Sequence, residues 1–116
     1  MNELKSGLIY DTAYGNAIRV RVITMVYPND RTAICLISDD HVREPVATLT
    51  CNLPQYPLAP GEFFVKDYSE NEGAADWLVR QGIAEATGES RSSGFVSIPV
   101  MRFTPAIQSL VDSFKH

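Results

Sequence analysis

The chain has 116 residues, 45% of them hydrophobic and 21% charged, which suits one domain, residues 1–116, with its own buried core. A net charge of −4 and a pI of about 5.0 argue against direct nucleic-acid binding and against an anionic membrane surface, since both favour basic proteins. No apolar run of about 18 residues and no apolar N-terminal signal segment occurs, so we expect no membrane span, no secretion signal and a cytoplasmic location.

The first half of the chain predicts an antiparallel meander of three strands. Residues 18–27 are rich in β-branched side chains, and their arginines alternate with valines at a period of two, as in a half-buried strand. Proline, asparagine and aspartate within residues 27–30 predict a tight turn, so the strand at residues 32–38 returns beside the first. In the third strand, residues 46–53, apolar and polar side chains alternate again, which indicates a sheet with one buried face.

A proline-rich loop follows and leads into a fourth strand. Three prolines within residues 52–61 remove backbone donors that a sheet needs, so this segment predicts an ordered surface loop. The next strand spans residues 63–68. Because successive side chains of a strand point to opposite faces, either Phe63 or Phe64 must point away from the core.

The second half adds a helix and a pair of strands. Ser69 followed three residues later by Glu72 is a capping-box pattern, which predicts a helix over residues 70–81 that ends at a glycine. Residues 83–87 and 95–103 predict the last two strands, joined by a polar segment.

The C-terminal segment predicts a second helix. Thr104 and Pro105 suit its first positions, and apolar residues then repeat at helical spacing. The elements therefore follow the order β-β-β-β-α-β-β-α. We predict a single α+β domain with one antiparallel sheet of five or six strands and both helices packed on one face.

Two cysteines, Cys35 and Cys51, fall on strands that the meander places side by side. If the connecting hairpin is centred near Arg43, the two thiols face each other and a disulfide is geometrically conceivable. The alternative is a pair of small, buried, reduced thiols, which is the ordinary state of cysteine in a reducing compartment. A nucleophile and base formed by Cys35 and His41 has no supporting motif around it.

Neither a metal nor a cofactor is indicated by the sequence. Asp39, Asp40 and His41 share one turn, but a zinc site needs further Cys or His ligands at defined spacing, and His116 is the one remaining histidine. None of the seven glycines forms a phosphate-binding pattern such as GxGxxG or GxxxxGK. We therefore expect no cofactor and a protein that is not an enzyme.

Four carboxylates gather where the first helix is predicted to begin, and aromatic residues lie nearby in the sequence. One interpretation is a solvated helix end, because carboxylates in the first turn stabilise the helix dipole. The functional interpretation is an acidic surface that meets Arg or Lys of a partner, with tyrosines as anchors. The candidate partner-binding residues are Asp67, Glu70, Glu72, Asp76, Tyr56 and Tyr68.

Five segments of the chain form a recognisable set: residues 33–36 (AICL), 44–53 (EPVATLTCNL), 65–72 (VKDYSENE), 82–88 (GIAEATG), and 93–95 (SGF) with 99–103 (PVMRF). Together they resemble an uncharacterised family of small domains from bacterial mobile elements such as plasmids and phages. The resemblance implies a genetic context for the protein. It implies no catalytic residue and no cofactor.

The resemblance also implies a class of function, because small proteins of mobile elements often inhibit host defence systems by occupying a protein surface, as anti-CRISPR proteins do. Defence nucleoproteins carry basic channels that an acidic domain can cover. We therefore expect a non-enzymatic inhibitor or modulator whose partner is a host protein or nucleoprotein complex with a basic surface. The alternatives are a homo-oligomeric structural or accessory protein, with a homodimer as the simplest case, and a small enzyme with an unfamiliar site.

Overall fold

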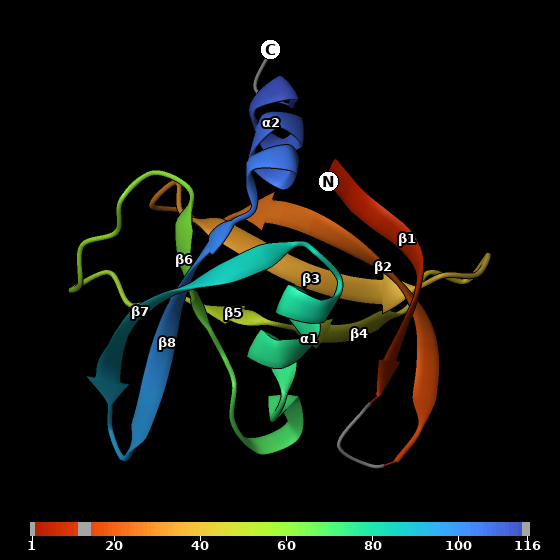
Figure 1. The fold of residues 1–116 in the computed structure, drawn as a ribbon. Helices are drawn as coiled ribbons and strands as arrows, with labels where there is room; N and C mark the ends of the chain where they lie inside the picture. The colour runs from red at the N-terminus through yellow and green to blue at the C-terminus, as the bar shows by residue number, and fades with distance from the viewer. Residues whose placement is uncertain (1, 12–14, 115–116) are drawn as a thin grey trace.

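The computed structural model describes residues 2–11 and 15–114 and contains two four-stranded antiparallel sheets (Figure 1). The first sheet has, in spatial order, β1 (Asn2–Asp11), β2 (Ala17–Val26), β3 (Thr32–Ser38) and β4 (Pro45–Thr48). The second sheet has β5 (Thr50–Cys51), β6 (Glu62–Val65), β8 (Val96–Phe103) and β7 (Ala84–Ser93). The helices are a short 3-10 helix, η1 (Ser69–Asn71), and two α-helices, α1 (Ala74–Arg80) and α2 (Pro105–Ser113).

The α+β class and the two α-helices are confirmed, but the prediction of one sheet with five or six strands is wrong. The described residues form eight strands in two sheets. One addition is β1, whose apolar residues do not alternate regularly. Gly7 has a φ of +69°, and the pairing of β1 with β2 shifts register on both sides of Lys5, so the period of two is lost in the sequence.

The segment predicted as one strand over residues 46–53 is in fact two strands that belong to different sheets. β4 pairs with β3, β5 pairs with β6, and the fully buried Leu49 lies between β4 and β5. The Leu49 amide donates to the carbonyl of Ile34 at 2.9 Å, and the Leu49 carbonyl accepts from the amide of Lys66 at 2.8 Å. A single residue, Leu49, therefore connects the two sheets. The alternation of apolar and polar side chains continues through this residue, so the sequence pattern does not reveal that the chain passes from one sheet to the other.

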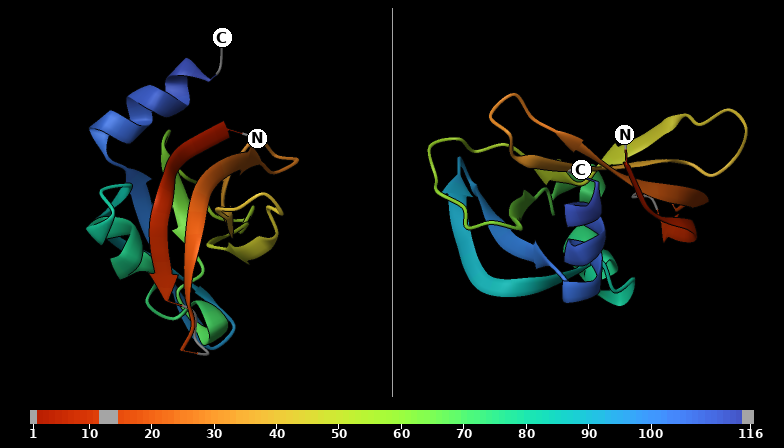
Figure 2. Two further views of the ribbon diagram at one scale, coloured as in Figure 1. Left: turned by 90° about the vertical axis from the view of Figure 1, so that its right-hand side faces the viewer. Right: turned by 90° about the horizontal axis from the view of Figure 1, so that it is seen from above.

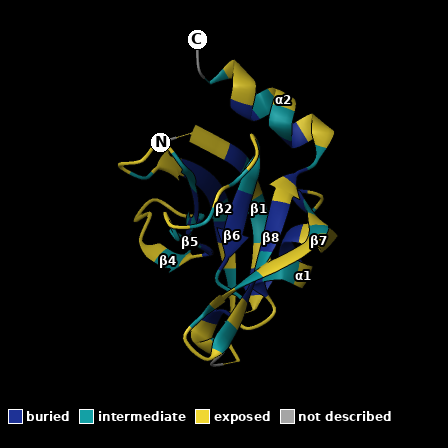
Figure 3. Ribbon diagram, turned by 90° about the vertical axis from the view of Figure 1, so that its left-hand side faces the viewer, coloured by how far each residue is buried: buried dark blue, intermediate teal, exposed yellow. Residues whose placement is uncertain are grey.

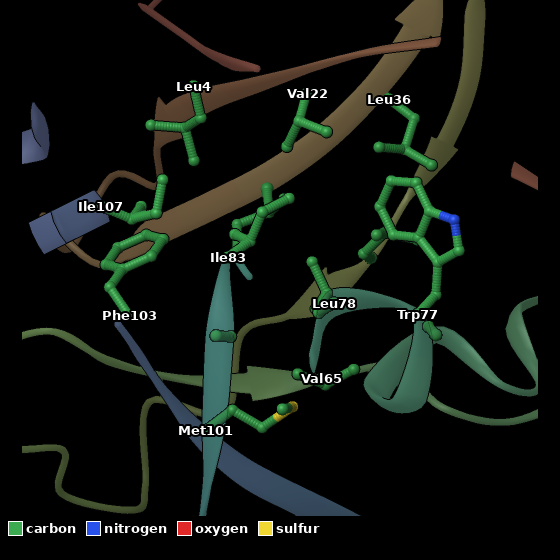
Figure 4. Packing of buried hydrophobic residues seen from close by; sticks show 14 of the residues in the cluster. Leu4, Val22, Leu36, Val65, Trp77, Leu78, Ile83, Met101, Phe103 and Ile107 are labelled. Carbon is green, nitrogen blue, oxygen red and sulfur yellow. The ribbon is translucent and has the colours of Figure 1, made fainter. Parts of the chain in front are cut away.

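The main core lies between the two sheets, and both α-helices contribute to it (Figure 4). Trp77 and Leu78 of α1, Val65 of β6 and Ile107 of α2 are all buried there. The Trp77 ring meets the Tyr10 ring edge to face at 5.2 Å, and its Nε1 donates to the carbonyl of Ile9 at 2.8 Å. The helices thus close a core shared by two sheets, which corrects the prediction that both cover one face of a single sheet.

A second, smaller cluster lies on the other face of the second sheet. Phe64 is buried here with Ile98 and Val100, whereas Phe63 is buried in the main core, so the predicted opposite directions of the two rings are confirmed. The proline-rich loop packs against this cluster. This contact explains why the loop is ordered although it belongs to no sheet. Figure 3 shows that β6 and β8 are largely buried, whereas the C-terminal half of β7 is mostly exposed.

The helix predicted over residues 70–81 is interrupted, and its capping box does not form. η1 ends at Asn71, Gly73 adopts a φ of +92°, and α1 begins at Ala74. Ser69 has a φ of +56° and does not cap α1; the Asp67 carboxylate accepts from the Gly73 amide at 2.7 Å instead. The reason is the glycine, whose left-handed conformation breaks the helix that the pattern predicts.

Cys35 and Cys51 are free, half-buried thiols on different sheets, so the facing geometry that would permit a disulfide is not present. The Cys35 sulfur lies 4.0 Å from the Met25 sulfur and 3.9 Å from Oγ1 of Thr48. Cys51 is paired with Phe64 in the other sheet. Burial raises the pKa of the Cys51 thiol, which favours its protonated form.

Candidate functional site

The segment from the end of β6 to the first turn of α1 holds the four predicted acids, and two of them also maintain its conformation. Asp67 accepts the hydrogen bond from the Gly73 amide. Glu70 receives the ammonium of Lys66 at 2.6 Å, and this hydrogen bond lowers the pKa of Glu70 from its usual 4.5 to about 2. Glu70 is therefore fully ionised at neutral pH, with part of its charge offset by Lys66.

The other two acids, Glu72 and Asp76, are exposed. Neither side chain has an ion pair or a hydrogen bond within the part of the chain that the structure describes. Asp76 also lies in the first turn of α1, where a carboxylate is favourable next to the helix dipole. Both carboxylates are therefore exposed and carry no ion pair with another described residue.

The two predicted tyrosines lie beside the second cluster, where they pack with Phe64. Tyr56 meets the Phe64 ring at 6.3 Å, and its hydroxyl donates to the carbonyl of Ser92 at 3.1 Å. The guanidinium of Arg91 lies 6.0 Å from the Tyr56 ring, so the surroundings of Tyr56 are basic. Tyr68 has the Lys66 ammonium 5.7 Å from its ring and borders the acids directly. The structure thus groups Tyr68, but not Tyr56, with the acids.

A further pair of carboxylates lies in the turn between β3 and β4. One Asp40 oxygen accepts hydrogen bonds from the Ser38 hydroxyl at 2.9 Å and from the amides of Val42 and Arg43 at 3.0 Å each. These bonds, the one from the Arg43 amide above all, lower the pKa of Asp40. Glu44 is exposed, and its amide donates to the Ser38 hydroxyl at 2.8 Å. These hydrogen bonds fix the conformation of the turn.

Two adjoining recesses join this turn to the predicted acids, and Glu70 and Asn71 line both. The first, the Lys66 recess, has a volume of about 480 Å³ and is lined by Val46, Ala47, Thr48, Thr50, Cys51, Lys66, Tyr68, Glu70 and Asn71. The second, the Tyr10 recess, has a volume of about 410 Å³ and is lined by Tyr10, Ile18, Ser38, Asp40, Glu44, Pro45, Val46, Ala47, Glu70 and Asn71. Asp40, Glu44 and Glu70 line the recesses. We call these three carboxylates, together with Asp67, Glu72 and Asp76 next to Glu70 in the chain, the acidic face.

Three segments distant in sequence build the Tyr10 recess at the acidic face, and sequence reasoning missed two of them. Tyr10 is the next-to-last residue of β1, Glu44 precedes β4, and Asn71 ends η1. Asn71 is only 3% exposed, and its Nδ2 donates to the carbonyl of Thr48 at 2.7 Å, which ties η1 to the edge strand of the first sheet. Leu8, Ile9 and Tyr10 are consecutive apolar residues, so alternation does not mark Tyr10 as a residue of the inner strand face.

The remaining candidate residues from the sequence are Asp39, His41 and the possible metal ligands. Asp39 accepts from Nε of Arg21 at 2.8 Å and from the Gly7 amide at 2.7 Å, so it stabilises the first sheet. His41 is exposed in the turn, and the Cys35 sulfur contacts Met25 and Thr48 instead of His41. Within residues 2–11 and 15–114, no three His, Cys, Asp or Glu side chains gather as a metal site would require. His116, the other histidine of the sequence, lies outside the described residues.

Comparison with known proteins places the chain in a family. Among the described residues, no helix has the length and apolar character needed to cross a membrane. The chain matches no curated protein and no solved structure. Residues 22–113, well over half of the chain, match the family described as "Domain of unknown function (DUF4313)". The chain therefore belongs to the DUF4313 family, whose function is unknown.

Proposed function

We propose that the chain is a non-enzymatic protein-binding domain, and that its acidic face contacts a basic surface of a partner protein. The observation that carries the proposal is the exposure of Glu44, Glu72 and Asp76 without any cationic partner among the described residues. Several carboxylates on one face raise the rate of association with a basic partner and set the register of the contact.

The shape of this face supports protein contact over simple solvation. Apolar side chains of Val46 and Ala47 line both recesses, between the carboxylates. Interfaces commonly combine such an apolar centre with a charged rim, because burial supplies affinity and charge supplies specificity. The hydrogen bonds that fix Asp40 also reduce the conformational entropy lost on binding.

The partner class that suits these properties is a host defence protein or nucleoprotein complex, located in the cytoplasm, whose basic channel the domain covers. The net charge of −4, the short chain and the resemblance to small proteins of mobile elements support this choice. The domain would then act as an inhibitor or modulator, as an anti-CRISPR protein does. Its binding would be sensitive to salt, since exposed charge contacts are screened at moderate ionic strength.

An affinity pull-down of the tagged chain from a bacterial lysate, at low and at moderate salt, tests the proposal. The expected result is one stoichiometric partner with a basic surface, identified by mass spectrometry, whose recovery falls as salt rises. Recovery of no partner at either salt concentration would contradict the proposal.

A second candidate function is homo-oligomerisation, and the outer face of the first sheet favours it. Met25 is 46% exposed there beside Ile37 and Cys35, around a recess of about 350 Å³. If two copies pair through this face, light scattering after size exclusion should give twice the chain mass for the wild type and a monomer for Met25→Lys. The matched control Val26→Lys changes the next residue of the same strand and should stay dimeric. A monomeric wild type would reject this function.

A further inference from the structure

The hydroxyl of Tyr10 is a polar group without a hydrogen-bond partner among the described residues, on an almost fully buried side chain of the Tyr10 recess. Tyr10 is only 4% exposed, yet its hydroxyl forms no hydrogen bond with any described residue. Every fully buried side-chain nitrogen or oxygen among the described residues has a partner, so the Tyr10 oxygen is not sealed in the core. Because Tyr10 lines the recess, its hydroxyl opens into that space.

Further oxygen acceptors surround the same space. Carboxylates of Asp40, Glu44 and Glu70 line the recess, together with the amide of Asn71. Asn71 is almost fully buried and uses Nδ2 for its bond to Thr48, which leaves its amide oxygen without a partner among the described residues. No Lys or Arg belongs to the described lining: Lys66 lines the adjoining recess, and Arg43 lines the recess on the outer face of the first sheet.

The walls of the recess are apolar and offer a surface for an aliphatic stem. Ile18, Pro45 and Val46 form them, and the volume of about 410 Å³ exceeds what one amino-acid side chain needs. A long cationic side chain can therefore bury its methylene groups against these walls while its head group meets the oxygens.

We propose that the Tyr10 recess receives the guanidinium of an arginine side chain carried by the partner protein. This inference rests on the proposed function and names the group that the acidic face recognises. A guanidinium presents five donors in one plane, which matches acceptors contributed from different sides by Tyr10, Glu44 and Glu70. A lysine ammonium has three donors around a point and would leave more of these oxygens unpaired.

A metal ion is a poorer occupant than a guanidinium. One oxygen of Asp40 already accepts three hydrogen bonds, and one oxygen of Glu70 already binds Lys66. A hard cation requires several free oxygens at short distance, and the described residues hold no such group of ligands.

The first test uses N-acetyl-arginine amide as the probe, with the neutral, nearly isosteric N-acetyl-citrulline amide as its control. The fluorescence of Trp77, the single tryptophan, reports binding because its ring contacts Tyr10. We expect saturable binding of the arginine probe with a Kd on the order of 1 mM, which is reasonable for so small a ligand. Equal responses to both probes, or no saturable response to either, would overturn the inference.

Two variants locate the bound probe. Glu44→Gln should weaken arginine-probe binding about tenfold, because it removes one charge-assisted contact, and Tyr10→Phe should weaken it about threefold. Glu89→Gln changes an exposed carboxylate on β7, outside both the lining and the acidic face, and should leave the Kd unchanged. Circular dichroism confirms that each variant is folded. If Glu89→Gln weakens the probe as much as Glu44→Gln does, the probe is held by general charge and the inference is wrong.

A third experiment, which measures the affinity for a captured partner, separates this inference from the proposed function. With a partner captured by the wild type, Glu44→Gln and Tyr10→Phe should each lower the affinity for that partner. Unchanged partner affinity in both variants would overturn the assignment of the recess while the proposed function stands. If the arginine probe binds but the wild type captures no partner, the proposed function fails, and the recess belongs to a free guanidinium compound instead of a protein side chain.

Discussion

Tyr10 and Tyr27 differ in what their hydroxyls contact. The Tyr27 hydroxyl lies 3.1 Å from Oγ1 of Thr50, whereas the Tyr10 hydroxyl has no partner among the described residues. A hydroxyl that opens into a recess contributes little to folding and is free for a ligand. At the residue scale, this contrast distinguishes a group that stabilises the protein from one that is available for binding.

Replacing each tyrosine by phenylalanine tests that contrast. We expect Tyr27→Phe to lower the free energy of unfolding by about 1 kcal/mol, the usual contribution of one hydrogen bond, and Tyr10→Phe to change it by less than about 0.5 kcal/mol. Urea unfolding measures both values. An equal loss in the two variants would show that the Tyr10 hydroxyl has a structural partner.

Glu70 provides a pH-dependent prediction. Its folded pKa of about 2 lies below the usual 4.5, so its pair with Lys66 contributes stability above about pH 4.5 that is lost as the pH falls toward 2. We expect the wild type to lose its stability advantage over Glu70→Gln across this interval. Thermal unfolding between about pH 6 and pH 2 measures the difference. A difference that does not change with pH would contradict the predicted pair.

Glu72→Gln is the matched control for this experiment, because Glu72 is an exposed carboxylate without an ion pair in the described chain. Its unfolding curves should follow the wild type at every pH. A pH-dependent difference of the same size in this control would assign the effect to total charge.

At the scale of elements, the sequence predicts best where local signals and packing agree. β2, β3 and β8 follow their β-branched segments closely, and α2 begins at Pro105 after Thr104, as predicted. The failures occur where the backbone changes direction without a change in pattern. Leu49 continues an alternating series yet turns the chain into another sheet, and Gly73 breaks a helix whose apolar spacing continues beyond it.

The proline-rich loop shows how one side chain fixes an element that has no regular structure. Arg31 donates from Nη1 to the carbonyl of Leu53 at 2.7 Å and from Nη2 to the carbonyl of Tyr56. Its guanidinium also lies 6.0 Å from the Phe64 ring beneath the loop. The loop therefore depends on a residue that precedes β3.

Arg31→Ala should release the loop from the second cluster. We expect a loss of about 2 kcal/mol in the free energy of unfolding, because two hydrogen bonds to a charged donor disappear and two carbonyls lose their partner. Hydrogen exchange should become faster in residues 52–61. The control Arg80→Ala removes an exposed arginine of α1 whose side chain has no partner among the described residues, and it should change stability by less than about 0.5 kcal/mol. Equal effects in both variants would contradict this role of Arg31.

At the scale of the whole molecule, the acidic face exists because the two sheets bring distant segments together. α2 stands at one end of the sheets, and η1 lies at the other end (Figures 1 and 2). The acids of residues 67–76 could be proposed from the sequence as a cluster. The contribution of Tyr10 and Glu44 could not, because it requires β1, the β3–β4 turn and η1 to meet, and no local pattern encodes that meeting.

Leu49 joins the sheets, so its side chain should matter for the entire fold. Leu49→Ala removes a fully buried side chain from the main core and should cost about 2–5 kcal/mol in the free energy of unfolding. Val42→Ala, which truncates a side chain that is 55% exposed in the β3–β4 turn, is the control and should cost less than about 0.5 kcal/mol. A loss from Leu49→Ala no larger than that of the control would contradict the connection of the two sheets at this residue.

The measurement that tests the central claim most directly compares two charge-reversed variants in the same pull-down. Glu72→Lys with Asp76→Lys alters the acidic face, and Glu89→Lys with Asp112→Lys alters carboxylates on β7 and α2. Each pair brings the net charge from −4 to 0, so total charge is matched. Recovery of the partner should be lost in the first variant and retained in the second. Equal recovery in both variants would contradict an acidic face that binds a basic partner.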